Sequence, residues 1–470
     1  MFEEKNTDGI FFIRRVAIIF GSIAAVVAVA LIIILVVPEP EPPETREERA
    51  IRIEEERQAF SESLTLEQLL YDFDYFMYVL EHNFPFFGVA YRQYGVDMMA
   101  LGAEFRANLE SGAIAPTALD FFEALRVDYI GRVNGMAHLG LLDRRWFISF
   151  LDGAITHAEH NAYSAFFLDM INRNPNTLLF YGGINEIDRE ERRNQWRYPN
   201  NITTDIIEEG RIAYLGIAHM LREVQPSDIV RLRPFYLQIA DFEHLIVDIR
   251  GNPGGRLRYP FDVFILPHMH FPAVYRHLTF YKGGEHNLNF LNAIFPNPRG
   301  LYSEPSHFAG YRVSVKDNMV FGRDTNHPLL DYVQTIDDFE AMDYYRSFSD
   351  FFSIYHSYYF RSSFRGQIWL LIDGRTASSA SQITALLKQL GMAITVGETA
   401  RGVHGSPGME GMHFILPNTG IVVRYDMGMT VCLLTGLIFE EGIPPHHYNL
   451  PGKDALETAL ALINSGAYRD

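Results

Sequence analysis

The chain has 470 residues, enough for about two or three domains, and its 48% content of hydrophobic residues excludes an intrinsically disordered protein. Its formal net charge is -18, from 40 Lys and Arg residues against 58 Asp and Glu residues, and no Lys/Arg-rich block offsets this excess. The balance argues against nucleic acid as a partner.

The first predicted element is a membrane anchor. Residues 16–37, VAIIFGSIAAVVAVALIIILVV, carry no charge and are long enough to cross a hydrocarbon core of ~30 Å at ~1.5 Å per residue. Arg14 and Arg15 precede them, so the positive-inside rule places residues 1–15 in the cytoplasm and the rest of the chain outside. The alternative is a cleaved signal peptide, which has a shorter apolar region ending at a small-residue site. The sequence favours a single-pass protein of the cell membrane that contacts lipid through this helix.

A spacer and a helical domain are predicted next. Residues 38–60 are rich in proline and glutamate, a composition typical of an extended, self-repelling spacer. Residues 61–145 are predicted to form a small helical domain. Its first helix extends from Thr65, an expected N-cap, to a stop at Pro85, and a second is predicted over 118–133.

The pattern changes in the second half of the chain. Short apolar runs typical of strands, RIAYLGI at 211–217 and HLIVDI at 244–249, alternate with helical patterns, which predicts an α/β core over 211–470. Residues 146–210 are charged and polar after the run WFISFL. They also lack the glycine-containing carboxylate-binding loop of a peptide-binding PDZ module, and they are predicted to be a connecting segment.

A glycine-rich turn follows directly after one of the predicted strands. The run HLIVDIRGNPGG (244–255) ends in Gly254 and Gly255, whose backbone reaches positive φ and carries no side chain to block a ligand. Exposed N–H groups in such a loop can stabilise a developing oxyanion. An ordinary glycine-rich turn is the alternative interpretation.

A cluster of hydroxyls marks the start of a predicted helix in DGRTASSASQI (373–383). Helical periodicity puts Ser379 on the apolar face with Ile383 and Leu387, so its side chain is predicted to point into the core. Ser378 falls on a different face and is the available hydroxyl, at a helix end whose dipole favours an oxyanion. The alternative is that these serines serve only as small residues and helix caps.

Five motifs occur in a fixed order along the chain. They are GMAHLGLLD (135–143), DIRGNPGG (248–255), TASSAS (376–381), GETARG (397–402) and EEGIPP (440–445). In combination and order they resemble the C-terminal processing (tail-specific) peptidases, a family that includes the tricorn core protease and retinoid-binding relatives. The resemblance covers the chain from about Leu64 to its C-terminus.

The resemblance implies a serine-type endopeptidase, a hydrolase with a crotonase-like (ββα) α/β core. It puts the nucleophile at Ser378, which the helical face also selects. It builds the oxyanion hole from the N–H of Ser379 with that of Gly254 or Gly255. It implies peptides or unfolded protein tails as substrates outside the cytoplasm, with no cofactor and no metal. Because the retinoid-binding relatives share this scaffold, a catalytically silent binding protein is the alternative.

The general base is the point on which the family divides. Tail-specific members use a lysine just after the G-E element, where this chain has Val403. The neighbouring Arg401 does not deprotonate in proteins. Lys388 lies on the helix of Ser378 but ~15 Å further along it, so it cannot reach back. A serine–lysine pair is therefore not expected.

The tricorn-like branch implies a histidine base instead. In this chain the matching residues are His138 and, behind it, Glu440 or Glu441 as the carboxylate that orients the imidazole. A histidine with pKa ~6.5 suits a general base at neutral pH. His404 is the alternative base.

Some residues depart from the family pattern. Ser381 stands where the family usually has a glutamate, and Ala137 stands where tricorn-like proteins place a helper serine. A buried structural histidine is therefore the alternative interpretation of His138. The remaining histidines follow no zinc-ligand spacing, so no metal site is predicted.

Overall fold

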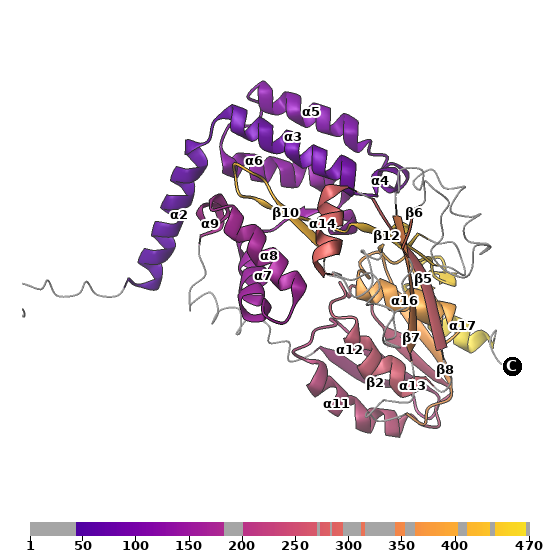
Figure 1. The fold of residues 1–470 in the computed structure, drawn as a ribbon. Helices are drawn as coiled ribbons and strands as arrows, with labels where there is room; N and C mark the ends of the chain where they lie inside the picture. Colours follow the sequence, from indigo (N-terminus) through magenta and orange to yellow (C-terminus); the bar gives the residue numbers. More distant parts are fainter. Residues whose placement is uncertain are drawn as a thin grey trace, which may run out of the picture. The chain divides into compact units, whose positions relative to one another are not determined.

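The computed structural model describes residues 44–182, 201–269, 273–282, 284–294, 312–314, 344–352, 362–402, 411–432 and 438–466 (Figure 1). The chain divides into two compact units, Met1–Glu54 and Glu55–Asp470. The predicted cytoplasmic tail, 1–15, and the predicted anchor, 16–37, lie outside the described residues, so both stay predictions. Within those ranges, no helix combines the length and the apolar character needed to cross a membrane.

The prediction of an extended spacer over 38–60 is wrong from Arg46 onward, because helix α2 (Arg46–Ser63) begins there. The N–H of Thr45 donates to Glu48 Oε2 at 2.9 Å, and the hydroxyl of Thr45 accepts the N–H of Glu48 at 3.2 Å. Arg52 also pairs with Glu44 at 2.8 Å. Arginines interspersed with the glutamates therefore supply opposite charges, so this segment does not repel itself as its glutamate content suggests.

The helical region begins as predicted. Helix α3 (Leu66–Asn83) follows Thr65, whose hydroxyl accepts the N–H of Gln68 while the Gln68 side chain accepts the N–H of Thr65. This reciprocal cap confirms Thr65 as the N-cap, and the helix ends before Pro85. The next elements are α4 (Phe87–Tyr94), α5 (Met98–Glu110), α6 (Ala118–Ala124), the π-helix η1 (Leu125–Tyr129) and the 3-10 helix η2 (Ile130–Val133). The last three confirm the helical prediction over 118–133.

Three further helices extend this region beyond its predicted end. They are α7 (Arg144–His157), α8 (Ala162–Arg173) and α9 (Asn176–Tyr181). Their buried side chains, such as Phe147 and Phe167, belong to the same hydrophobic core as Phe76 of α3. The segment predicted as a connection over 146–210 is therefore helical as far as Tyr181, because apolar residues recur at helical spacing among its charged ones.

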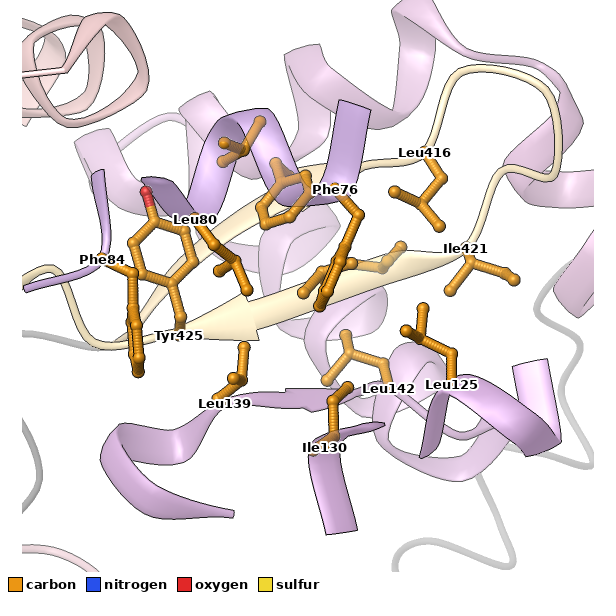
Figure 2. Close-up of a cluster of buried hydrophobic side chains, with 14 of the residues drawn as sticks. Phe76, Leu80, Phe84, Leu125, Ile130, Leu139, Leu142, Leu416, Ile421 and Tyr425 are labelled. Atoms are coloured by element: carbon orange, nitrogen blue, oxygen red, sulfur yellow. The ribbon is translucent and has the colours of Figure 1, made fainter. Parts of the chain in front are cut away.

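A β-hairpin from much later in the chain completes the helical core. Strands β10 (Met412–Ile415) and β11 (Val422–Tyr425) pair antiparallel, and β1 (Gly140–Leu141) adds to the other side of β11. Figure 2 shows Leu416, Ile421 and Tyr425 of this hairpin among side chains of the helical region, including Phe76 and Leu80. The hairpin thus packs with the helices although it falls within the range predicted as catalytic core.

The α/β core contains a six-stranded sheet in the order β13-β9-β8-β4-β3-β2. Five strands run parallel, and the sixth, β2 (Ile202–Glu208), pairs antiparallel with β3. The parallel strands are β3 (Ile212–Ile217), β4 (His244–Asp248), β8 (Gln367–Ile372), β9 (Ile394–Gly397) and β13 (His447–Tyr448). Parallel neighbours need crossover connections, which include the helices α11 (Gln225–Gln238) and α16 (Ser379–Gln389). The predicted α/β core behind a helical region is confirmed.

The central strands of the six-stranded sheet are buried on both faces. Leu245 and Val247 of β4 pack in one hydrophobic core with residues of α16. Ile246 packs in a second core with Trp369 of β8 and with residues of helix α17 (Ala455–Ser465). A strand covered on both faces needs a continuous apolar run, which explains why the sequence there does not alternate. The carboxyl ends of β3, β4 and β8 meet at one edge, where α/β proteins place their sites.

A second, four-stranded antiparallel sheet has the order β12-β5-β7-β6. It is formed by β12 (Gly428–Cys432), β5 (Ala273–Tyr281), β7 (Tyr344–Phe352) and β6 (Arg312–Ser314). Among the described residues between β4 and β8 are also α12 (Arg258–Pro260), the π-helix η4 (Phe261–Ile265), α13 (Leu266–His268) and α14 (Glu285–Ile294). Because β12 follows β11 after two residues, Asp426 and Met427 connect the hairpin to this sheet.

Candidate active site

Ser378 stands on the sharp turn between β8 and α16. It is the N-cap residue of α16, with φ 52° and ψ -128°, a combination that residues with a Cβ rarely adopt. Such backbone strain costs about 1–3 kcal/mol and persists only where the surroundings hold it. The half-buried Ser378 does not cap the helix with its hydroxyl, so a capping role does not explain its position.

Two hydrogen bonds from the neighbouring residues hold this turn. The hydroxyl of Thr376 donates to the carbonyl of Ile249 at 3.0 Å. The N–H of Ala377 donates to the carbonyl of Asn252, also at 3.0 Å. Both acceptors belong to the segment that follows β4, so the serine turn is fastened to the glycine loop on the adjacent strand.

Ser379 is turned the other way, as predicted. Its side chain is buried, and its hydroxyl donates to the sulfur of Met220 at 3.3 Å. The prediction that Ser379 points into the core is confirmed. As the first residue of α16, Ser379 has a backbone N–H without an acceptor inside the helix. That N–H stands next to Ser378, where it can stabilise an oxyanion.

The glycine loop lies directly against the serine turn. Gly254 has φ 89°, and a Cβ added to it would lie 2.7 Å from Ser378 Cβ and 2.8 Å from the nitrogen of Ser379. Glycine is therefore required both by the backbone and by the contact. The N–H of Gly254 donates to Asn252 Oδ1 at 2.8 Å. Of the two predicted glycine donors, Gly255 is the one whose N–H makes no hydrogen bond within the described part of the chain.

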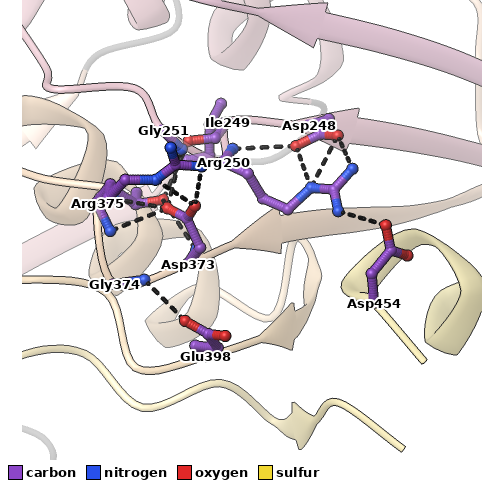
Figure 3. A network of polar contacts seen from close by, with 10 residues as sticks. Asp248, Ile249, Arg250, Gly251, Asp373, Gly374, Arg375, Glu398 and Asp454 are labelled. Carbon is purple, nitrogen blue, oxygen red and sulfur yellow. Dashed lines mark hydrogen bonds and ion pairs between the residues drawn. The ribbon is translucent and has the colours of Figure 1, made fainter. Parts of the chain in front are cut away.

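A network of charged side chains fixes the glycine loop (Figure 3). Asp373, at the end of β8, accepts the N–H of Gly251 at 2.9 Å. On the other side, Arg250 pairs with Asp248 at 2.7 Å and with Asp454, the N-cap of α17, at 3.0 Å. The loop is thus tied to the serine turn through Asp373 and to α17 through Arg250.

The same network determines the charge of Asp373. Burial by itself would raise the pKa of Asp373, but the N–H of Gly251 and the side chain of Arg375 stabilise the carboxylate more strongly. The pKa of Asp373 is therefore lowered. A polar cavity of about 620 Å³ opens beside the network, and neither Ser378 nor His138 lines it.

Strand pairing brings His138 to a buried carboxylate. In the ladder of β1 and β11, Gly140 lies opposite Arg424, and continuing this register places His138 opposite Asp426. Nδ1 of His138 lies 2.9 Å from Oδ2 of Asp426, and the N–H of Asp426 donates to the carbonyl of Ala137 at 2.7 Å. The Asp426 side chain is 4% exposed, whereas that of His138 is 27% exposed. Asp426 belongs to none of the five motifs and was not predicted from the sequence.

The backbone around His138 is strained. Ala137 and His138, in the 3-10 helix η3 (Met136–His138), have φ 50° and 49°. Glu440, buried in the 3-10 helix η8 (Phe439–Glu441), accepts the N–H of Ala137 on its Oε1 at 2.6 Å. The carboxylate predicted to orient the imidazole thus binds the backbone of the preceding residue, and the carboxylate at Nδ1 is that of Asp426.

Other candidates for the base and its partner lie elsewhere. Glu441 forms an ion pair with Arg92 at 2.7 Å. Nζ of Lys388 donates to the carbonyl of Pro444 at 2.6 Å, near the far end of α16, which confirms that this lysine does not reach back to the serine turn. His404 lies outside the described residues.

A short segment after β9 connects the serine turn to η8. The N–H of Arg401 donates to the carbonyl of Thr376 at 2.8 Å, and the hydroxyl of Ser381 lies 2.5 Å from the carbonyl of Arg401. The next residue, Gly402, packs so closely on Glu440 that a Cβ would lie 2.3 Å from the Glu440 carbonyl. Ser381, where the family usually has glutamate, therefore has a structural role in joining these segments.

The described residues include each kind of group that acyl transfer to a serine requires. These groups are a hydroxyl at a helix N-terminus, an imidazole held by a carboxylate, and backbone N–H donors beside the hydroxyl. Across the described ranges, no three or more His, Cys, Asp or Glu side chains gather in a way that could hold a metal ion.

The comparison with protein families agrees with this chemistry. The model of a family described as Peptidase family S41 matches residues 211–448, just over half of the chain. No curated protein matches. Among solved structures, mature CPAF complexed with lactacystin is 12% identical, with 85% of this chain and 97% of that chain covered and a TM-score of 0.47. A lipoprotein from Streptococcus agalactiae is 12% identical, with 85% and 96% covered and a TM-score of 0.39. The photosystem II D1 C-terminal processing protease is 15% identical, with 57% and 53% covered and a TM-score of 0.30.

Proposed function

Because the chain belongs to peptidase family S41, a family of serine peptidases, we propose that it is an endopeptidase with Ser378 as nucleophile and His138 as general base. The observation that carries this proposal is the 2.9 Å contact between His138 Nδ1 and the buried Asp426. A carboxylate that accepts the N–H of one imidazole nitrogen fixes the tautomer in which the other nitrogen carries the lone pair that accepts a proton. The substrates are peptides or unfolded protein tails.

Asp426 determines which nitrogen of His138 acts. Nδ1–H donates to the Asp426 carboxylate, so Nε2 carries the lone pair that takes the proton of Ser378. Asp426 stays ionised and stabilises the imidazolium that forms, and Nε2 then gives the proton to the leaving amine. Because Asp426 is buried, solvent screens this interaction weakly.

The oxyanion hole in this proposal uses the N–H groups of Ser379 and Gly255. Ser379 is supported as a donor by its place at the N-terminus of α16, where the helix dipole adds to the hydrogen bond. Gly255 replaces Gly254 as the glycine donor, because Asn252 already accepts the N–H of Gly254. Gly254 is required instead for the close approach of the loop to the serine.

Glu440 is a positioning residue. Its Oε1 accepts the N–H of Ala137, the residue before His138, and both of these residues have positive φ. The hydrogen bond stabilises a backbone conformation that is costly without it. Glu440 therefore acts through the backbone, and Asp426 acts on the imidazole itself.

The proposed location is the outer side of the cell membrane. It is supported by the uncharged run 16–37 and by Arg14 and Arg15 before it. The crotonase-like architecture that the motifs imply would then face the extracytoplasmic space. Protease added to intact cells should remove the chain beyond the anchor, and a secreted mature protein beginning near Leu31 would contradict the anchor.

The alternative is a catalytically silent binding protein, which the departures at Ala137 and Ser381 favour. Hydrolysis of an unstructured peptide distinguishes the two functions. Ser378→Ala should abolish hydrolysis with the fold intact, whereas Ser379→Ala should be milder, because only its backbone N–H takes part. A folded wild-type protein that hydrolyses no peptide, or a Ser378→Ala variant that retains full activity, would refute the enzyme proposal.

A further inference from the structure

A second cavity, of about 400 Å³, lies in the helical region. Its walls come from α7, from the N-terminal end of α8 and from β11. The aromatic side chains that line it are Trp146, Phe150 and Tyr163, and the one arginine among its lining residues is Arg424. The cavity thus combines aromatic surface with polar side chains, which include the guanidinium of Arg424 and the imidazole of His157.

Arg424 has no acidic partner in this cavity. Its guanidinium carbon lies 5.7 Å from the ring centroid of Phe150, which is a cation–π contact. Its Nε is buried and makes no hydrogen bond, and within the described part of the chain Arg424 forms no ion pair. Because Nε is buried, a ligand in the cavity reaches only the terminal N–H groups of Arg424, and these can donate to a carboxylate.

Arg424, in the wall of this cavity, is a near neighbour along β11 of the carboxylate that contacts His138. Arg424 stands two residues before Asp426, so the two side chains leave the chain on the same side, about 7 Å apart at strand spacing. Burial lowers the pKa of the nearby His413 well below its ordinary value, and the charges of Arg424, Asp426 and His138 all act on it.

The N-terminus of α8 strengthens the same preference. Asn161 caps this twelve-residue helix, and Asn161, Tyr163 and Ser164 all line the cavity. The positive end of the helix dipole therefore adds to the charge of Arg424. Both features favour an anion, and the aromatic walls favour an anion attached to an apolar group.

We propose that the Arg424 cavity is a specificity subsite that binds a carboxylate of the peptide substrate. The carboxylate is either the C-terminal group or an acidic side chain, and the apolar part of the bound segment packs on Trp146 and Phe150. This inference rests on the proposed peptidase function.

Matched peptides test the subsite. One carries a free C-terminal carboxylate and no acidic side chain, the second is its C-terminal amide, and two further amidated peptides differ only by Asp or Asn. The variant Arg424→Met keeps a side chain over Phe150 without charge, and Arg424→Lys restores the charge. Arg106→Met, at an exposed arginine paired with Asp74, is the control for the loss of one positive charge.

We expect wild-type protein and Arg106→Met to prefer at least one carboxylate-bearing peptide over its neutral counterpart by about 10- to 100-fold in kcat/KM. Arg424→Met should lose this preference, and Arg424→Lys should recover part of it. If amidation of the C-terminus removes the preference, the bound carboxylate is that of the chain end. If replacing Asp by Asn in the peptide removes it, the bound carboxylate is that of an acidic side chain. Equal ratios in wild type and Arg424→Met, or no preference in wild type, overturn the proposal.

Binding separates the subsite from the chemistry. The same peptides are titrated into Ser378→Ala protein and into the double variant Ser378→Ala/Arg424→Met, with fluorescence anisotropy as the readout. The subsite predicts a preference for the carboxylate in the first protein that is absent from the second. If wild type hydrolyses nothing while this difference in Kd persists, the peptidase proposal fails and the subsite stands; without a difference in Kd, the subsite is refuted.

Discussion

Replacing Asp426 with asparagine changes one buried atom group beside His138 and leaves the volume of the side chain nearly unchanged. Oδ2 of Asp426 lies 2.9 Å from Nδ1 of His138, in a side chain that is 4% exposed. An amide NH₂ group facing Nδ1 would favour the tautomer with its proton on Nε2, which cannot accept the proton of Ser378. An amide oxygen in the same place would carry no charge to stabilise the imidazolium.

The expected loss in kcat is about 10³- to 10⁴-fold, or roughly 4–5.5 kcal/mol of transition-state stabilisation. Glu440→Gln is the matched control, because its amide oxygen can still accept the N–H of Ala137 that Glu440 Oε1 accepts at 2.6 Å. This second variant should lose less than about tenfold, since it removes a charge but keeps the hydrogen bond.

The assay is kcat/KM for an unstructured peptide as a function of pH. Wild-type activity should rise through a histidine-like pKa, ~6.5 before any local shift. In Asp426→Asn the residual activity should rise at lower pH, because no anion then stabilises the protonated imidazole. An Asp426→Asn variant with more than a tenth of wild-type activity, beside a Glu440→Gln variant that loses more than about a hundredfold, would refute the assignment of the two carboxylates.

Four further outcomes are expected. Gly254→Ala should reduce peptide hydrolysis by about 100-fold or more, because its Cβ would lie 2.7 Å from Ser378 Cβ. Gly452→Ala, at a glycine with φ 72° and open space around it, is the control. Equal effects of the two substitutions on hydrolysis would contradict the importance of this contact. Because the pKa of Asp373 is lowered in the folded protein, its ionised carboxylate stabilises the fold at pH values above its ordinary pKa of 3.8. This stabilisation is lost as the pH falls through the lowered pKa. In Asp373→Asn, the free energy of unfolding, measured by urea denaturation, should therefore decrease less steeply as the pH is lowered. An unchanged pH dependence would count against the network. Lys388→Met should keep peptide hydrolysis within about tenfold of wild type, since Nζ of Lys388 donates to the carbonyl of Pro444. A loss as large as that of Ser378→Ala would indicate that Lys388 is the general base. His138→Ala should match Ser378→Ala in severity and His404→Ala should retain most activity, whereas the reverse order would make His404 the base.

The different directions of the Ser378 and Ser379 side chains could be predicted from the sequence, because helical periodicity depends only on nearby residues. Ile383 and Leu387 mark the apolar face of α16 on which Ser379 falls, although in the structure all residues from 379 to 387 are buried. Thr65 was predictable for the same reason, since a capping box needs only Gln68 three residues later. The strained φ of Ser378 has no such local signal, because the surrounding tertiary contacts impose it.

Asp426 could not be predicted in this way, because its partner lies 288 positions away. Its role follows from the register of β1 with β11, and β1 is only two residues long. The available signal was an aspartate directly after the apolar run IVVRY, at the place where a strand ends. Motif matching pointed instead to Glu440, which is close in space but binds the backbone of Ala137.

The extent of the helical region was also set by contacts distant in sequence. The hairpin of β10 and β11 buries Phe414 and Tyr425 among helices that precede it by more than two hundred residues. Burial of apolar surface stabilises a core without regard to chain order, so a boundary drawn from composition alone fails here. The charged residues of α7 and α8 similarly concealed their apolar faces.

The most direct test of the central claim is covalent labelling of the purified protein with a fluorophosphonate probe, followed by mass-spectrometric mapping of the modified residue. Such a probe reacts with a serine that a general base activates. The account predicts a single modified serine, Ser378, with labelling lost in His138→Ala and strongly reduced in Asp426→Asn. Modification of a different serine, or labelling of Ser378 that is unchanged in His138→Ala, would contradict it.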